Sequence, residues 1–229
     1  MKYLEYRLIG SNIKHTKGER VMNYEEFKIK VTGISQILGS CPMDKEIFSK
    51  YIATKADEAN KDLAIGDVDN ITDSADKVTG FYRDKDGSPI LKGYQLKGFL
   101  KEAGKALKDQ IQVAATASKV DNYVFILERD IPLFDADGNR IKNIDGYLER
   151  PLRAETMQGP RVSLAKSEYL NEGWNFTATI RVIESKGTAK SKPLDAELVK
   201  QMLDYGALKG LLQWRNAGYG SFEYEVITE

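Results

Sequence analysis

The chain has little sulfur or imidazole chemistry, because it contains one cysteine and one histidine among 229 residues. With Cys41 alone, neither an intramolecular disulfide nor a zinc site built from cysteines can form. A catalytic pair of Cys41 and His15 is the weaker interpretation, since a single cysteine followed by a proline is more often a structural thiol than a nucleophile. We therefore expect no metal site.

Long apolar runs and nucleotide-binding motifs are also missing. No apolar run approaches the length of a membrane span, and the first residues lack a signal-peptide pattern, so a cytoplasmic location is expected. Neither a phosphate-binding loop ending in Gly-Lys-Ser/Thr nor a Gly-x-Gly-x-x-Gly helix start is present, which argues against a nucleotide cofactor. Lys plus Arg equals Asp plus Glu, at 34 each, so a nucleic-acid binder must gather its basic residues on one surface.

The hydrophobic patterns that are present predict an α+β fold. Strict alternation or continuous apolar runs predict four core strands, at Phe27–Ile34, Tyr123–Leu127, Trp174–Ile183 and Phe222–Val226. Helical spacing predicts a helix that follows the strand Pro89–Leu91 and ends near Lys108, and another over Leu194–Leu203. This order suits an RRM- or ferredoxin-like core with an antiparallel sheet. Two hairpins are expected, with turns at Asp86-Gly87 and Asp135–Asn139.

We expect a single domain over 1–229 with two additions to the core. An inserted lobe at 40–80 combines a predicted helix, Met43–Leu63, with an acidic stretch from Asp57 to Asp76. The acidic residues lack the fixed spacing of a calcium loop, so a solvated insertion is expected that could meet a basic face of a neighbouring copy. The second addition, at 129–168, is a hairpin followed by a basic loop.

The predicted helix after Pro89–Leu91 is the first candidate binding surface. Its lysines recur on one face, and Gly93 and Gly98 could let an anionic backbone approach the positive end of the helix dipole. The alternative is a solvated lysine face on an ordinary core helix. The candidate binding residues here are Lys92, Lys97 and Lys101.

The segment from Gly146 to Lys166 is the second candidate. It is punctuated by Pro151 and Pro160, so we expect a loop rather than one regular element. Arginine can contact phosphates and stack on bases, and an apolar tip at Met157 could wedge between bases. The alternative is an arginine-rich loop neutralised by Glu149, Glu155 and Glu168. The candidate binding residues are Arg150, Arg153, Met157, Arg161 and Lys166.

The glycine-rich segment before the last strand is the third candidate. Its glycines could bring backbone N–H groups up to a phosphodiester, while an aromatic ring stacks on a base. Alternatively, the glycines only allow positive φ in a tight turn, and Trp214 belongs to the core. The candidate residues are Trp214, Arg215, Asn216, Gly218, Tyr219 and Gly220.

Three stretches of the sequence together resemble the RAMP superfamily, the RRM-like proteins of CRISPR effector complexes. The stretches are Pro89–Lys101, with its Leu-Lys-Gly-x-Leu-Lys helix start, Arg161–Val182 and the glycine-rich Gly206–Phe222. The sequence departs from the family's pattern at Tyr94-Gln95, where the family has a serine pair. The resemblance implies a non-catalytic backbone subunit that binds RNA, or a stand-alone phage-encoded relative that binds single-stranded DNA.

Three functions remain as hypotheses. The first is a single-stranded nucleic-acid-binding protein that assembles along its ligand with copies of itself. The second is a protein-binding module that uses the acidic lobe, for instance as a phage anti-defence or assembly factor. The third is a metal-independent endoribonuclease with His15 as general base beside Lys14, Lys17 or Tyr6.

Overall fold

A computed structural model describes residues 8–9, 12–13, 22–43, 78–156, 159–187, 189 and 191–227. His15 and nearly all of the predicted helix and acidic stretch of the 40–80 lobe lie outside these ranges, so the lobe stays a prediction. Within the described ranges no helix is both long and apolar enough to span a membrane.

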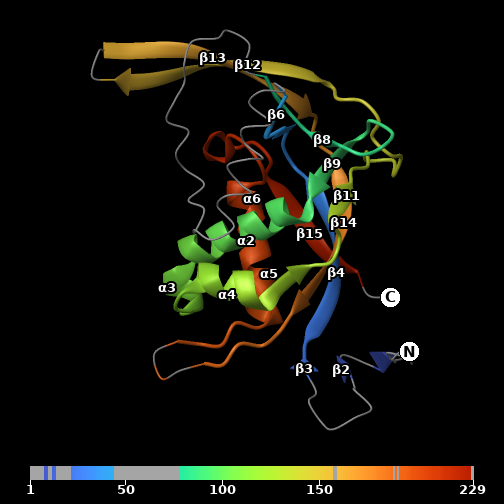
Figure 1. Cartoon of the computed structure of the whole chain (residues 1–229), viewed down its shortest axis with the longest axis vertical. Helices are drawn as coiled ribbons and strands as arrows, with labels where there is room; N and C mark the ends of the chain where they lie inside the picture. Colours follow the sequence, from blue (N-terminus) through green and yellow to red (C-terminus); the bar gives the residue numbers. More distant parts are fainter. Residues whose placement is uncertain are drawn as a thin grey trace, which may run out of the picture.

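The core of the molecule is an antiparallel four-stranded sheet with two helices on one face. Its strands are β4 (Glu25–Gly33), β10 (Val124–Ile126), β14 (Asn175–Val182) and β15 (Phe222–Ile227), and their order in the sheet is β10-β14-β4-β15. The helices α2 (Gly93–Ala106) and α5 (Ala196–Asp204) lie on the same side of it (Figure 1). The chain therefore runs β-α-β-β-α-β through the sheet, with the first strand between the third and the fourth. The predicted α+β, ferredoxin-like core is confirmed.

Hydrophobic alternation decides which face of the sheet is covered. On β4, Phe27, Ile29 and Val31 are buried, and they pair across the sheet with alternate buried residues of β14 such as Phe176 and Ile180. The apolar stripe of α2 packs onto this face and is buried, as expected for an amphipathic helix; it comprises Leu96, Phe99, Leu100 and Ala103. Polar residues of the same strands point to the open face.

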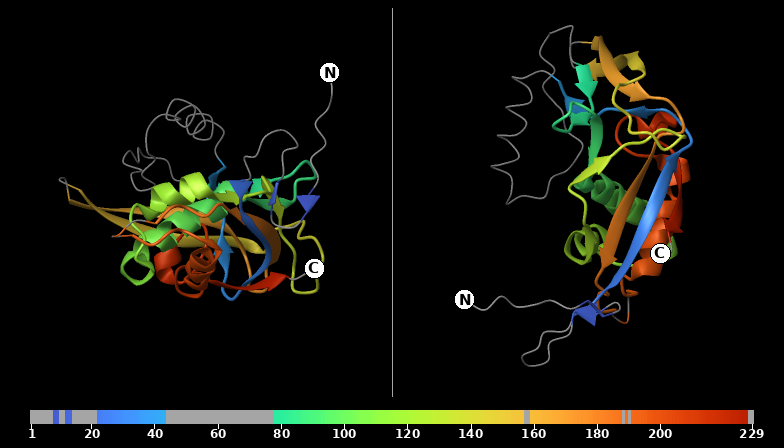
Figure 2. Two further views of the ribbon diagram at one scale, coloured as in Figure 1. Left: turned by 90° about the horizontal axis from the view of Figure 1, so that it is seen from below. Right: turned by 90° about the vertical axis from the view of Figure 1, so that its right-hand side faces the viewer.

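The segment predicted as a basic loop is instead a regular two-stranded ribbon. Strands β12 (Gly146–Thr156) and β13 (Gly159–Leu170) pair from Gly146 opposite Tyr169 to Thr156 opposite Gly159. The two views of Figure 2 show the ribbon extending beyond the helices. The prolines misled the prediction, because a strand at the edge of a sheet tolerates proline: β12 is an edge strand, and Pro160 lies near the free end of the ribbon.

Shorter elements complete the described chain. Both predicted hairpin turns are confirmed, since β8 (Tyr82–Arg83) pairs with β9 (Pro89–Lys92) around the Asp86-Gly87 turn and Phe134 pairs with Arg140 around the other. The remaining strands are β1 (Leu8–Ile9), β2 (Asn12–Ile13), β3 (Met22–Asn23), β5 (Ile37–Leu38), β6 (Cys41–Pro42), β7 (Val78–Gly80), β8 (Tyr82–Arg83), β9 (Pro89–Lys92) and β11 (Asp130–Pro132). The remaining helices are α3 (Lys108–Ile111), α4 (Thr116–Tyr123), α6 (Gly206–Lys209) and the 3-10 helix η1 (Arg215–Ala217).

Candidate nucleic-acid interface

The ribbon and the glycine-rich loop after α6 meet in a stack of three side chains. The Arg150 guanidinium, from β12, lies over the Trp214 ring with its carbon 4.1 Å from the ring centroid. The Trp214 and Tyr219 rings are stacked, with centroids 5.3 Å apart and planes 13° from parallel. We name Arg150, Gln213, Trp214 and Tyr219 the loop cluster. Its loop is the red segment between α6 and the ribbon in Figure 1.

Arg150 is buried although it has no carboxylate partner among the described residues. Its exposed fraction is 7%, and burial lowers the pKa of its guanidinium, an effect that the nearby Tyr219 partly opposes. Nη2 donates to Oε1 of Gln213 at 3.0 Å. Nε and Nη1 are buried and have no hydrogen-bond partner in the described structure. Such a group is rare, because buried donors are nearly always paired.

Gln213 joins the loop cluster to the strands beneath it. Its Oε1 accepts hydrogen bonds from Oγ1 of Thr79 at 3.2 Å and from Oγ of Ser167 at 3.3 Å, in addition to the bond from Arg150. Thr79 lies on β7 and Ser167 on β13, which are paired as parallel neighbours. Gln213 therefore connects the Arg150 side chain to β7 and β13 and so fixes its position.

The backbone of the loop explains how Trp214 comes to stand out from it. Trp214 has φ 54° and Leu212 has φ 62°, which are left-handed backbone conformations that residues other than glycine rarely adopt. Gly220 has φ 73°, and a Cβ there would meet the Leu211 carbonyl oxygen at 2.2 Å. As a result Trp214 is 36% exposed and is not a core residue, whereas the other tryptophan, Trp174, is 1% exposed.

The lysine face of α2, defined as Lys92, Lys97 and Lys101, is bound to acceptors of the protein itself. Lys92 forms an ion pair with Asp130 at 2.6 Å, and Lys101 forms one with Asp121 at 2.7 Å. Lys97 donates to the backbone oxygen of Asp121 at 2.9 Å, and its pKa is lowered chiefly by burial.

The start of α2 is also occupied. The N–H of Gly93 donates to Arg129 O at 2.9 Å, and the N–H of Lys92 donates to Gln95 Oε1 at 2.8 Å. A Cβ at Gly93 would lie 2.2 Å from Glu128 O, so the close approach at this glycine is to the chain's own backbone. The helix start thus uses protein acceptors where the sequence suggested a phosphate, and a binding role for the three lysines stays a prediction.

The other predicted residues are dispersed. Lys166 pairs with Glu149 at 2.9 Å, as the neutralised alternative expected, whereas Glu168 pairs with Arg83 at 2.6 Å. Arg153 and Arg161 lie on facing strands, opposite Val162 and Ala154, but their side chains and all of Met157 lie outside the described residues.

The loop residues beside Trp214 are held by α2 and α6. Arg215 forms an ion pair with Glu102, and Asn216 accepts a hydrogen bond from Lys209 Nζ at 2.5 Å. Gly218 has φ 87° and open space where a Cβ would point. Of the predicted residues with described side chains, Arg150, Trp214 and Tyr219 are therefore the ones whose side chains stack on one another.

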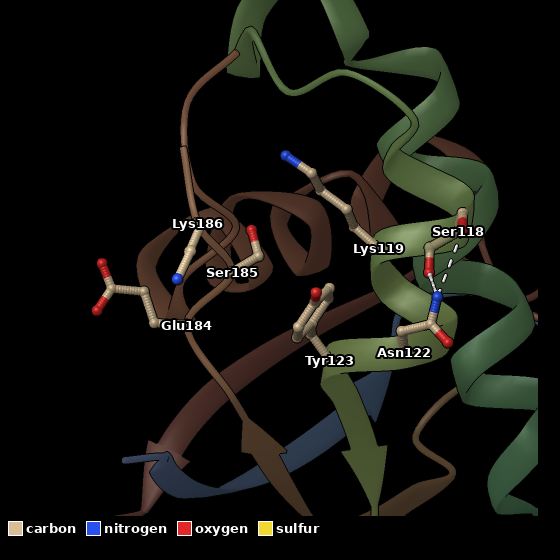
Figure 3. Close-up of a pocket in the computed structure, with 7 residues that line it drawn as sticks. All are labelled: Ser118, Lys119, Asn122, Tyr123, Glu184, Ser185 and Lys186. Carbon is tan, nitrogen blue, oxygen red and sulfur yellow. Dashed lines mark hydrogen bonds between the residues drawn. The ribbon is translucent and has the colours of Figure 1, made fainter. Parts of the chain in front are cut away.

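Two other surfaces are less suited to a nucleic acid. On the open face of the sheet Lys30 pairs with Glu225 at 3.6 Å and Arg181 pairs with Glu26 at 2.7 Å, so positive charge does not accumulate there. A shallow pocket of about 470 Å³ lies between α4 and residues 184–186 (Figure 3), and its Lys119 is already bound to Ser191 and to the Lys192 carbonyl. No cluster of metal-ligating side chains occurs in the part of the chain that the structure describes.

Sequence reasoning missed the residues that create the difference between these surfaces. Gln213, Asp121 and Glu102 each hold a predicted residue, yet none of them was predicted as a binding residue. A partial signal was available for Gln213 alone, since it directly precedes Trp214 in the glycine-rich loop.

No protein-family model and no curated protein sequence matches the chain. Chains of two solved structures are similar to this chain. One is a chain of the structure described as a Type III-B Cmr-beta bound to cognate target RNA, with 10% identity, a TM-score of 0.44, and coverage of 90% of this chain and 61% of that one. The other is a chain of a Type IV-B CRISPR complex, with 12% identity, a TM-score of 0.46, and coverage of 89% and 91%. Identities and scores of this size say nothing about activity.

Proposed function

We propose that this protein binds single-stranded nucleic acid without cleaving it, and that the loop cluster contacts a base. The observation that carries the proposal is the stack of Arg150, Trp214 and Tyr219, in which Trp214 remains 36% exposed. Aromatic surface beside a cation is the usual platform for unpaired bases, and one stacked base contributes about 1–3 kcal/mol. A duplex keeps its bases stacked on each other, so the site favours a single strand.

The proposal extends to the finer family assignment and to assembly. The ferredoxin-like strand order and the exposed glycine-rich loop are compatible with a RAMP-like backbone subunit, which is what the three sequence stretches resemble. In that role, copies of the chain assemble along one strand.

The test is fluorescence anisotropy with single-stranded RNA, single-stranded DNA and duplex DNA of about thirty residues, at two salt concentrations, with particle size followed in parallel. We expect salt-sensitive binding to one single strand and growth into larger particles. Trp214→Ala should weaken binding about tenfold or more, because it removes the stacking surface. The matched control is Phe125→Ala, which removes an aromatic ring of similar exposure, 39%, from β10, where the ring centroid lies 5.2 Å from Lys97 Nζ, and it should change the affinity by less than about twofold. Absence of binding at low salt, or equal losses in the two variants, contradicts the proposal.

A further inference from the structure

Arg150 has hydrogen-bonding capacity that the described protein does not use. Its Nε and Nη1 are buried without acceptors, while Nη2 is held by Gln213. Guanidinium has five N–H donors and no acceptor, and it does not lose its proton in proteins even when burial lowers its pKa. The described residues therefore surround a fixed positive charge and leave two of its donor nitrogens unpaired.

The acceptor that matches this group best is an anionic oxygen. Hydrogen bonds from guanidinium to phosphate or carboxylate oxygens are short and about twice as strong as those between neutral groups. No carboxylate is paired with Arg150 among the described residues, whereas Arg83, Arg140, Arg181 and Arg215 each have one. The unpaired donors lie directly beside an aromatic stack, and this combination favours the phosphate of a nucleotide over an acidic peptide.

Trp214 is the group that separates Arg150 from solvent on one side. Its ring lies 4.1 Å from the guanidinium carbon, yet the residue itself is 36% exposed and holds an unfavourable left-handed φ of 54°. Side chains in such strained positions persist only where the surroundings hold them, and they are common at ligand clamps and switches. Movement of the indole would uncover one face of the Arg150 guanidinium.

We propose that Arg150 is a phosphate-binding site covered by Trp214. One phosphodiester group of the bound strand accepts hydrogen bonds from Nε and Nη1, and the indole leaves the guanidinium to stack on the adjacent base. This site rests on the proposed function for its natural ligand, but its chemistry can be tested without a strand.

The first experiment uses Arg150→Met, which keeps an unbranched apolar stem against Trp214 and removes charge and donors together. In titrations with oligothymidylate and oligouridylate, we expect an affinity about tenfold lower and a slope of log K against log salt smaller by about one. Arg150→Lys restores the charge and should recover the slope but not the full affinity, because lysine binds phosphate as a point charge. An unchanged slope and affinity in Arg150→Met overturns the site.

The second experiment observes the indole directly. Of the two tryptophans, Trp174 is buried and donates from its ring nitrogen to Ser35 O at 2.8 Å, so a change in emission on ligand binding reports on Trp214. We expect inorganic phosphate, compared with chloride at equal ionic strength, to shift the emission and raise the melting temperature of the parent protein. Neither effect should occur in Arg150→Met, which should melt no lower than the parent because a buried unpaired donor is removed. No phosphate effect in the parent protein, or the same effect in Arg150→Met, overturns the site.

The outcomes separate this site from the proposed function. If strands do not bind but phosphate acts through Arg150, the proposed function is wrong and the anion site stands. If strands bind through Trp214 and Arg150→Met changes nothing, the proposed function stands and the anion site is wrong. If poly-glutamate replaces phosphate with equal effect, the ligand is an acidic protein segment and the proposal is overturned.

Discussion

The lysine face of α2 and the loop cluster differ in how their positive charge is used. On α2 the charge is abundant in sequence, but Asp130 and Asp121 lie within 2.7 Å of Lys92 and Lys101. In the loop cluster a single arginine is buried against an aromatic ring and has no acid beside it in the described structure. Basic residues counted along a helix therefore say little about binding until their carboxylate partners are known.

The glycines of the two regions have different structural roles. The largest predicted effect on stability is that of a substitution at Gly220 in the glycine-rich loop. Gly220→Ala would place a Cβ 2.2 Å from the Leu211 carbonyl oxygen at a φ of 73°. Backbone strain of this kind costs about 1–3 kcal/mol even before the steric clash, so we expect a loss of about 3 kcal/mol in the free energy of unfolding. Urea denaturation measures it. Strand binding should fail with it, since the loop that carries Trp214 is displaced.

The matched substitution on α2 should have the opposite sign. Gly98 is helical and has open space at the Cβ position, so Gly98→Ala should raise the free energy of unfolding by about 0.5–1 kcal/mol through helix propensity. Strand affinity should stay within about twofold of the parent value. If Gly98→Ala instead abolishes binding, a strand approaches α2 at this glycine and the comparison between the two regions is reversed.

A smaller effect is expected from removing acids rather than bases. Glu102 pairs with Arg215 and lies 3.3 Å from Lys209, so Glu102→Gln leaves two positive charges unpaired beside the loop cluster. We expect strand affinity to rise about threefold at low salt and the gain to vanish at high salt, because the added attraction is screened.

Asp121→Asn is the corresponding change on the lysine face, where it leaves Lys101 without its partner at 2.7 Å. A strand held at the loop cluster should gain less than about twofold from it. Anisotropy titrations of both variants measure the difference. A larger gain from Asp121→Asn than from Glu102→Gln would place the strand on α2.

The core strands and helices could be predicted because the spacing of apolar residues that indicates each of them lies within a short stretch of sequence. The burial of Ile29 and Phe176 follows directly from the period of their strands. The ribbon could not be predicted, because a strand that contains Pro151 is acceptable only at the edge of a sheet. The residues of a strand do not by themselves indicate whether it lies at the edge or in the middle of its sheet.

The candidate site was predictable as a set of residues but not as an arrangement. Arg150, Trp214 and Tyr219 follow from their chemistry and from the glycine-rich loop. Their mutual contact depends on the ribbon and on Gln213, which joins segments far apart in the sequence. Neutralisation of the lysine face depends likewise on Asp121 of a later helix, to which the spacing of the lysines gives no clue.

The most direct test of the central claim is ultraviolet cross-linking of the intact protein to a single strand, followed by mass spectrometry of the cross-linked peptides. We predict that the strand attaches to the glycine-rich loop, at Trp214 or Tyr219, and that Trp214→Ala reduces the yield. Cross-links confined to α2 or to the open face of the sheet, with none in the loop, would contradict the assignment of the loop cluster as the binding site.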